Sequence, residues 1–372
     1  MQQKIKKDSA KTEHLSMSVM AQATAAQPYQ RCLVMAGGGF RFGYYLGMMA
    51  ALEQHQRAPD VLVASCGAAI AAAVIRNLPD NASRFEFLSS PQMYAYWCGL
   101  GSNPQKKLST TLKDLGQRAL WSRFMQTAPD LYQDYLFEVP PLLPLPEPQS
   151  YAGAPELAII AGRVLYPSAA AGSRIGGPWF EETVFAEGAL AAALNGMVSP
   201  LAPVHFPGSR IAPQIRVQSG VALTDAVRAS ISDMYYFRCH EIAGQAYIGG
   251  VVDLFPIEIA SRLASQIVME RKAPYDRLLG LPAVRAVLGF DGNQRIREVN
   301  QQFADYWVDT ADMTSALTKH QIGKRINWRA NRIELVMPAT YPQFRQMLQL
   351  QWDYGYQRAC LALGVEAGRN AA

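Results

Sequence analysis

The sequence predicts a three-layer α/β fold, in which a mainly parallel central sheet carries helices on both of its faces. The apolar runs at residues 32–35 and 61–63 have the composition of strands buried on both faces. Each run leads through a turn of glycine or other small residues into a helical stretch, at residues 67–75 after the second run. Strand and helix signals keep alternating along the 372 residues, which is typical of parallel sheets.

The later elements are expected to continue this alternation. Residues 200–213 contain four prolines and little periodicity, so they are expected to form a surface loop. Residues 84–148 are rich in aromatic side chains and end in a proline-rich connector. We interpret them as a helical insertion or a lid. The further strands are expected at 156–166, 179–186, 215–218, 284–290 and 333–337, and the further helices at 225–232 and 341–363.

The domain organisation is expected to be simple. Residues 1–29 are polar and contain several lysines, which predicts a disordered tail. Residues 30–372 are expected to form one domain, because the motifs described below lie more than 200 residues apart and must converge to build one site. Within that domain, residues 264–372 are the C-terminal part that completes the fold.

Composition restricts the classes of function. A net charge of +5 without long basic runs makes nucleic acid an unexpected partner, whereas contact with an anionic membrane stays open. The five cysteines are odd in number and have no C-x-x-C spacing, which disfavours zinc sites and disulfide frameworks. We therefore expect a reducing compartment, the cytoplasm, with at most peripheral membrane contact. No run approaches the ~18 apolar residues of a membrane-spanning helix.

Two turns carry the candidate chemistry. Gly37, Gly38 and Gly39 follow the first strand and leave backbone N–H groups bare at the start of a helix, where they can stabilise an oxyanion. Ser65 and Cys66 lie on the second turn between small residues, as a nucleophile elbow requires. The turn thus offers two candidate nucleophiles. A dinucleotide fingerprint would need glycine at position 42, so no cofactor is expected.

The stretch GGGFRFGYYLGMMAALEQ resembles the signature of patatin-like phospholipases, with Arg41 and Gly47 at two of its characteristic positions. A count without gaps places Cys66 at the family's catalytic serine. A register shifted by one residue places Ser65 there instead, but it leaves bulky Val63 where the family has a small residue. We favour Cys66. Phe42 replaces another family glycine and crowds the oxyanion turn.

The family's second catalytic element is an aspartate followed by two small residues. The matching position holds Ile248, which precedes Gly249 and Gly250 and is therefore a degenerate base position. Residues 225–232 resemble the family's A-x-R-A-S helix and support this register. The resemblance covers residues 31–263 and implies a protein that acts on lipid acyl esters, as a hydrolase or an acyltransferase.

Two hypotheses follow from the altered site. A helix N-terminus lowers the pKa of a thiol, so Cys66 is expected to ionise without a carboxylate base. Alternatively, the chain is a catalytically inactive module that binds lipid or a protein partner. Ile248 is expected to point toward Cys66. Asp233, Asp253 and His240 are expected to be structural or solvated rather than catalytic.

Overall fold

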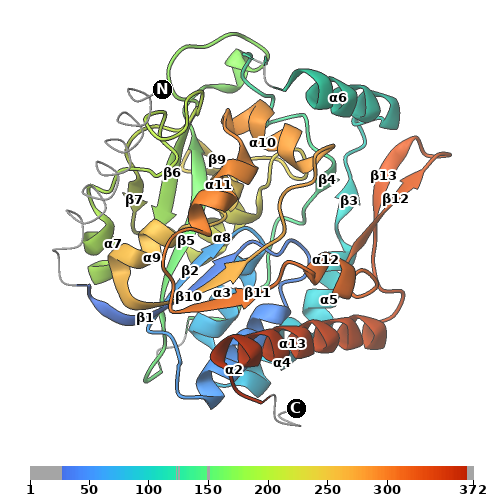
Figure 1. The fold of residues 1–372 in the computed structure, drawn as a ribbon. Helices are drawn as coiled ribbons and strands as arrows, with labels where there is room; N and C mark the ends of the chain where they lie inside the picture. Colours follow the sequence, from blue (N-terminus) through green and yellow to red (C-terminus); the bar gives the residue numbers. More distant parts are fainter. Residues whose placement is uncertain (1–26, 123, 125, 149–150, 367–372) are drawn as a thin grey trace, which may run out of the picture.

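The computed structural model describes residues 27–122, 124, 126–148 and 151–366. The tail expected at residues 1–29 therefore lies almost entirely outside the described residues. Within them the chain forms a three-layer α/β structure around a mainly parallel sheet (Figure 1). The fold class predicted from the sequence is confirmed.

The main path of the central sheet runs in the order β11-β10-β1-β2-β5-β6-β7. Neighbouring strands are parallel, except that β5 pairs with β6 in the antiparallel sense. The antiparallel pair β8 and β9 joins the sheet through β5. The strands are β1 (Tyr29–Ala36), β2 (Val61–Ser65), β5 (Glu156–Val164), β6 (Phe180–Phe185), β7 (Arg216–Gln218), β8 (His240–Ile242), β9 (Gln245–Ile248), β10 (Ala264–Arg271) and β11 (Tyr306–Asp309).

Alternating side chains of the central strands enter two separate hydrophobic layers. In β1, Leu33 and Met35 face one layer, while Cys32 and Val34 face the other. Both faces of these strands are therefore buried, which explains why their sequences are apolar throughout.

Helices cover each face. One layer contains α2 (Tyr44–Gln54), α3 (Ala68–Asn77), α8 (Leu223–Ile231) and α13 (Tyr341–Leu363), and the other contains α7 (Gly188–Leu194), α9 (Ile257–Leu263) and α11 (Gly292–Val299). The helices α2 and α13 cross at two glycines, which permit backbone contact. A Cβ atom on Gly47 would lie 1.9 Å from the carbonyl oxygen of Trp352, and one on Gly355 would lie 1.8 Å from that of Tyr44.

Two of the expected strands differ from the structure. Residues 284–290 lie mostly in helix α10 (Gly280–Leu288), which ends at Gly289 with a φ of 81°. The strand prediction was wrong because a short apolar run does not distinguish a buried strand from a buried helix. The strand expected at 333–337 exists as β13 (Arg332–Val336), but it pairs with β12 (Gly323–Asn327) in a separate hairpin. The sheet instead contains β10 and β11, which the sequence did not indicate.

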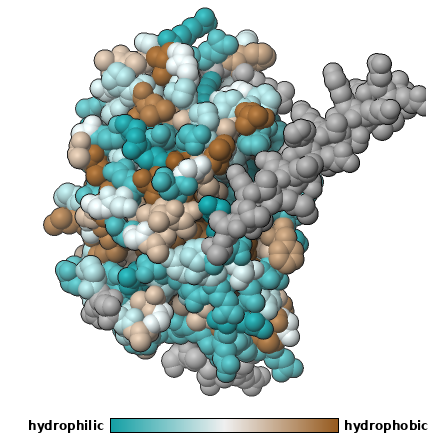
Figure 2. Space-filling view, turned by 90° about the vertical axis from the view of Figure 1, so that its left-hand side faces the viewer, coloured by the Kyte–Doolittle hydropathy of each residue, from teal (hydrophilic) through white to brown (hydrophobic). Residues whose placement is uncertain are grey.

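The region at 84–148 is helical only in its first part. It contains most of α4 (Asn81–Leu88), then α5 (Pro91–Cys98) and α6 (Leu108–Trp121), and the short strands β3 (Gly101–Ser102) and β4 (Phe137–Glu138) pair with each other. Among the described residues, no helix combines the length and apolar character needed to cross a bilayer. On the face that carries α7 and β7, apolar residues are interspersed with polar ones (Figure 2).

Candidate active site

The glycine turn after β1 has a backbone that glycine adopts easily. Gly37, Gly38 and Gly39 have φ values of 81°, 96° and 58°. A Cβ atom on Gly38 would lie 3.2 Å from the rings of both Tyr44 and Tyr45, so the turn is also close to α2. Within the described part of the chain, no group accepts a hydrogen bond from the backbone N–H of Gly38 or Gly39. These two N–H groups are therefore available to an oxyanion.

A fully buried carboxylate, Glu270 on β10, supports the base of this turn. It accepts a hydrogen bond from the N–H of Ala36, the residue before the glycines, at 2.9 Å. Glu270 was not predicted from the sequence, because β10 is apolar only in its centre and carries polar residues at both ends. Its other donors lie at 2.6–3.1 Å and are the side chains of Tyr44, Tyr45, Lys272 and Thr310.

The turn between β2 and α3 separates the two candidate nucleophiles. Ser65 is the last residue of β2 and is fully buried, and its hydroxyl donates to the backbone carbonyl of Asp253 at 2.8 Å. Cys66 follows it with a φ of 53°, a left-handed conformation that is uncommon for a residue with a side chain. Cys66, rather than Ser65, therefore occupies the sharp point of the turn.

The two turns lie against each other at one edge of the sheet. A Cβ atom on Gly67 would lie 2.2 Å from the carbonyl oxygen of Gly39, so these backbones are in direct contact. Gly250 packs from the other side, because a Cβ atom there would lie 2.7 Å from the backbone nitrogen of Cys66. Small residues at positions 39, 67 and 250 thus allow three distant segments to converge on Cys66.

A carboxylate does reach the thiol, but from a position that the sequence comparison did not assign. The Cys66 thiol donates a hydrogen bond to Oδ1 of Asp233 at 2.9 Å. Asp233 follows α8, the helix that resembles A-x-R-A-S. The same helix supplies Ser230, whose hydroxyl accepts from the Cys66 N–H at 2.9 Å and donates to the carbonyl of Ile160 at 2.7 Å. One short segment therefore holds both the backbone and the side chain of Cys66.

Ile248 has no carboxylate, but the carboxylate of Asp233 lies against Gly249, the residue that follows Ile248. A Cβ atom on Gly249 would lie 2.1 Å from Oδ1 of Asp233, so the missing side chain makes room for that oxygen. Ile248 itself is buried in an apolar cluster and lies close to Gly162 of β5. Asp233 contacts the Cys66 thiol, a contact that the sequence did not indicate, because its position after α8 aims it at the turn.

The pKa of the Cys66 thiol also differs from the expectation. Burial, and then the nearby Asp233 carboxylate, raise the pKa of the Cys66 thiol well above its ordinary value. The expected lowering by the helix N-terminus was wrong, because these two effects outweigh it at a side chain that is only 2% exposed. Burial raises the pKa of Asp233 to about 7, although hydrogen bonds from Cys66 and from the backbone of Val251 act to lower it. The resting thiol is therefore protonated.

The other acidic and basic candidates have different partners. Asp253 forms a buried ion pair with Arg295 at 3.3 Å, and His240 pairs with Asp225 at 3.0 Å. Burial lowers the pKa of Arg41, whose buried Nε has no hydrogen-bond partner among the described residues. Among the residues that the structure describes, no cluster of histidine, cysteine and acidic residues is suited to a metal ion.

A comparison with known families supports the same relationship that the motifs indicated. The family model described as patatin-like phospholipase matches residues 33–261, which is more than half of the chain. This range includes both turns, α8 and the segment at Gly249 and Gly250. A search of curated proteins found no match. The chain belongs to the patatin-like phospholipase family.

Proposed function

We propose that this chain is a lipid acyl hydrolase or acyltransferase in which Cys66 is the nucleophile and Asp233 is the general base. The observation that carries the proposal is the hydrogen bond of 2.9 Å between the Cys66 thiol and Asp233. A protonated thiol is a weak nucleophile, so it needs a base within hydrogen-bond reach. A carboxylate with a pKa of about 7 is well suited to accept and return a proton near neutral pH.

The proposed reaction has two balanced steps. Sγ of Cys66 attacks the acyl carbonyl carbon while its proton moves to Asp233. The C–O bond to the alcohol then breaks, Asp233 gives the proton to the leaving oxygen, and a thioester remains on Cys66. Water or an acceptor alcohol next loses a proton to Asp233 and attacks the thioester. The C–S bond then breaks, Asp233 returns the proton to Sγ, and the acid or the new ester is released.

The glycine turn supplies the electrostatic part of this mechanism. Attack on the carbonyl places negative charge on its oxygen, and the free N–H groups of Gly38 and Gly39 lie beside the turn that carries Cys66. Such donors are effective because they are already oriented before the charge develops. Arg41 adds a half-buried positive charge on the same loop.

One observation favours the second hypothesis, a module that binds lipid without turnover. Cys66 is only 2% exposed, so its side chain is almost completely covered. Phe40 next to the glycine turn packs edge-on against Trp97 and Phe237. A substrate must therefore displace side chains before it reaches the thiol, and we propose that residues 84–148 belong to this cover.

The cellular location is proposed from the state of the cysteines. The five cysteines are all free, which agrees with a reducing compartment. We place the protein in the cytoplasm, in peripheral contact with membranes, and we treat residues 30–372 as one functional domain.

Hydrolysis of p-nitrophenyl acyl esters tests the proposal. We expect wild type to release p-nitrophenol, Cys66→Ala to be inactive, and Cys98→Ala to match wild type, since Cys98 is an exposed thiol elsewhere. A fluorophosphonate probe tests the base separately. It should label Cys66→Ser but not the double variant Cys66→Ser with Asp233→Asn. If folded wild type and Cys66→Ala are equally inactive, the binding-module hypothesis replaces the enzyme.

A further inference from the structure

Helix α6 and the residues just after it expose several large apolar side chains. Leu112, Leu120, Trp121 and Phe124 are 47–77% exposed, and the rings of Trp121 and Phe124 contact each other with centroids 6.3 Å apart. Exposed Lys113 lies on the same helix. Scattered single apolar residues are ordinary on a protein surface, but exposed Leu120 and the contacting pair of Trp121 and Phe124 gather at one helix end, which indicates an interaction site.

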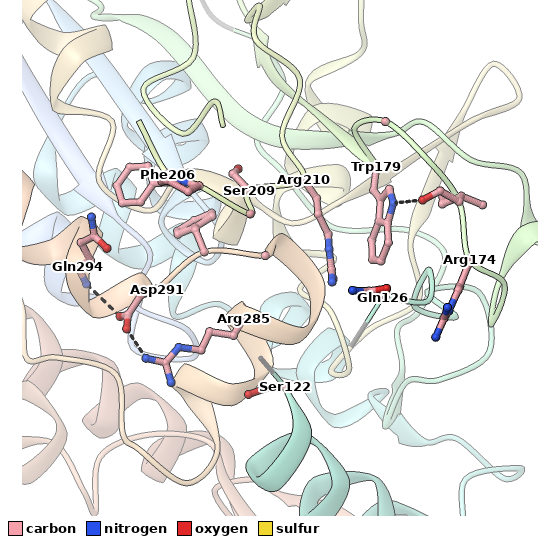
Figure 3. A pocket seen from close by; sticks show the side chains of 16 residues that line it. Ser122, Gln126, Arg174, Trp179, Phe206, Ser209, Arg210, Arg285, Asp291 and Gln294 are labelled. Carbon is pink, nitrogen blue, oxygen red and sulfur yellow. Dashed lines mark hydrogen bonds and ion pairs between the residues drawn. The ribbon is translucent and has the colours of Figure 1, made fainter. Parts of the chain in front are cut away.

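A polar cavity of about 630 Å³ lies directly beside this helix end (Figure 3). Ser122, which follows α6, forms part of its lining, and Arg285 lines it from α10. The charged residues of the lining are three arginines, Arg174, Arg210 and Arg285, against one aspartate, Asp291. The cavity therefore has an excess of positive charge and fits an anion.

The arginines are held in defined positions. The Arg210 guanidinium lies 3.7 Å from the centre of the Trp179 ring and donates to the backbone carbonyl of Ala286 at 2.5 Å. Arg285 is paired with Asp291. Figure 3 shows Arg285 on one side of the cavity and Arg174 on the other, with Arg210 pointing between them.

Backbone contacts make the floor of the cavity rigid. Gly208 and Gly289 have φ values of 92° and 81°, and a Cβ atom on Gly289 would lie 2.1 Å from the carbonyl oxygen of Gly208. The N–H of Arg210 also donates to the carbonyl of Leu288 at 2.9 Å. The loop that carries Arg210 is thus fixed against the end of α10.

We propose that the end of α6 and this cavity form one membrane-docking surface, in which Trp121 and Phe124 enter the interfacial layer while the arginines bind the phosphate of an anionic phospholipid. A bilayer is the partner that offers an apolar layer and phosphate groups side by side, as the exposed aromatic pair and the cavity require. Trp and Phe side chains favour this layer, and basic residues are attracted to anionic lipid. The inference rests on the proposed function only in so far as the substrate is a membrane lipid.

Flotation with vesicles tests the proposal independently of catalysis. The full chain carrying Cys66→Ala is mixed with vesicles of phosphatidylcholine alone or with added phosphatidylglycerol, so that no turnover alters the lipid. We expect binding to the anionic vesicles and much weaker binding to the neutral ones. Failure to bind anionic vesicles would overturn the docking surface, whereas failure of ester hydrolysis would overturn the catalytic proposal alone.

Matched variants locate the surface. The double change Trp121→Ser with Phe124→Ser should weaken vesicle binding more than about ten-fold, since two aromatic side chains leave the interface. Arg174→Gln should weaken it about five-fold. The controls Phe303→Ser and Arg297→Gln change equally exposed residues elsewhere and should bind as the parent does.

Three results would contradict the proposal. The first is unchanged binding by the Trp121 and Phe124 double variant, and the second is an equal loss in the control variants. The third comes from titration of inorganic phosphate into the protein. If free phosphate binds through Arg174 and fully displaces the vesicles, the ligand of the cavity is a soluble anion and not a membrane headgroup.

Discussion

Two carboxylates contact the two turns of the candidate site, Glu270 fully buried and Asp233 half-buried, and their surroundings differ sharply. Glu270 under the glycine turn is surrounded by hydrogen-bond donors, including the charged Lys272. Asp233 beside the second turn has no cation among its partners in the described residues, and it accepts a hydrogen bond from the Cys66 thiol. Glu270 is fully buried and Asp233 is half-buried, and their hydrogen-bond partners differ in number and charge.

The contrast separates a structural role from a chemical one. A carboxylate that accepts hydrogen bonds from many donors fixes the backbone and the side chains around it. A carboxylate buried without a cation is poorly stabilised as an anion, so it accepts a proton readily. We therefore assign Glu270 to holding the glycine turn and Asp233 to proton transfer.

The largest expected effect comes from removing the base. Asp233→Asn keeps the size of the side chain but cannot accept the thiol proton, so kcat/KM for a p-nitrophenyl ester should fall by ~10²- to 10⁴-fold. Asp225→Asn is the matched control, because Asp225 lies on α8 and pairs with His240 at 3.0 Å. An Asp233→Asn variant with wild-type kcat/KM would contradict the assignment.

Substitution of Glu270 should change the free energy of unfolding rather than proton transfer. Glu270→Gln leaves the buried Lys272 without its countercharge, so the free energy of unfolding in urea should fall by about 3–5 kcal/mol. Glu86→Gln removes an exposed pair with Arg345 and should cost no more than about 1 kcal/mol. If Glu270→Gln is as stable as the Glu86 variant, the comparison between the two carboxylates fails.

The pH dependence of stability should reveal Asp233 directly. Its folded pKa of about 7 lies above its ordinary value, so the folded protein holds the proton more tightly than the unfolded chain. The stabilisation from this group is complete below about pH 4 and is lost as the pH rises through 7. Asp233→Asn should therefore be the more stable protein at pH 8, by on the order of a few kcal/mol, and similar to wild type at pH 4. Urea unfolding of wild type and Asp233→Asn at pH 4 and pH 8 measures this difference. Equal free energies of unfolding at pH 8 would contradict a raised pKa of Asp233.

The smallest effect is expected at Ile248. Ile248→Val removes one buried methyl group and should cost about 0.5–1.5 kcal/mol of unfolding free energy. The kcat/KM should stay at the wild-type value, since Asp233 supplies the carboxylate. A large loss of activity in a folded Ile248→Val protein would show that Ile248 takes part in the site.

Much of the fold could be predicted from the sequence because many strands and turns have a local sequence pattern. Strands β1 and β2 are apolar on both faces, and the three glycines mark the turn after β1. By contrast, β10 is apolar mainly in its centre and includes Glu270, whose charge is tolerated only because distant side chains surround it. Such long-range compensation leaves no local pattern.

The site was only partly predictable for the same reason. The order of the motifs led to Cys66 and to the altered position at Ile248. It did not indicate that Asp233, fifteen residues earlier, replaces the expected carboxylate in space, because that depends on how Gly249 and α8 pack together. The pKa of the thiol was misjudged because a helix N-terminus is visible in a sequence, whereas burial is not.

The most direct test of the central claim is the mass of the peptide that contains Cys66 after incubation with a p-nitrophenyl acyl ester. We predict one added acyl group on this peptide in the wild-type protein, removable by hydroxylamine as a thioester is, and much slower acylation in Asp233→Asn. Acylation of a different residue, or equal rates of Cys66 acylation in the two proteins, would contradict the proposed Cys66–Asp233 pair.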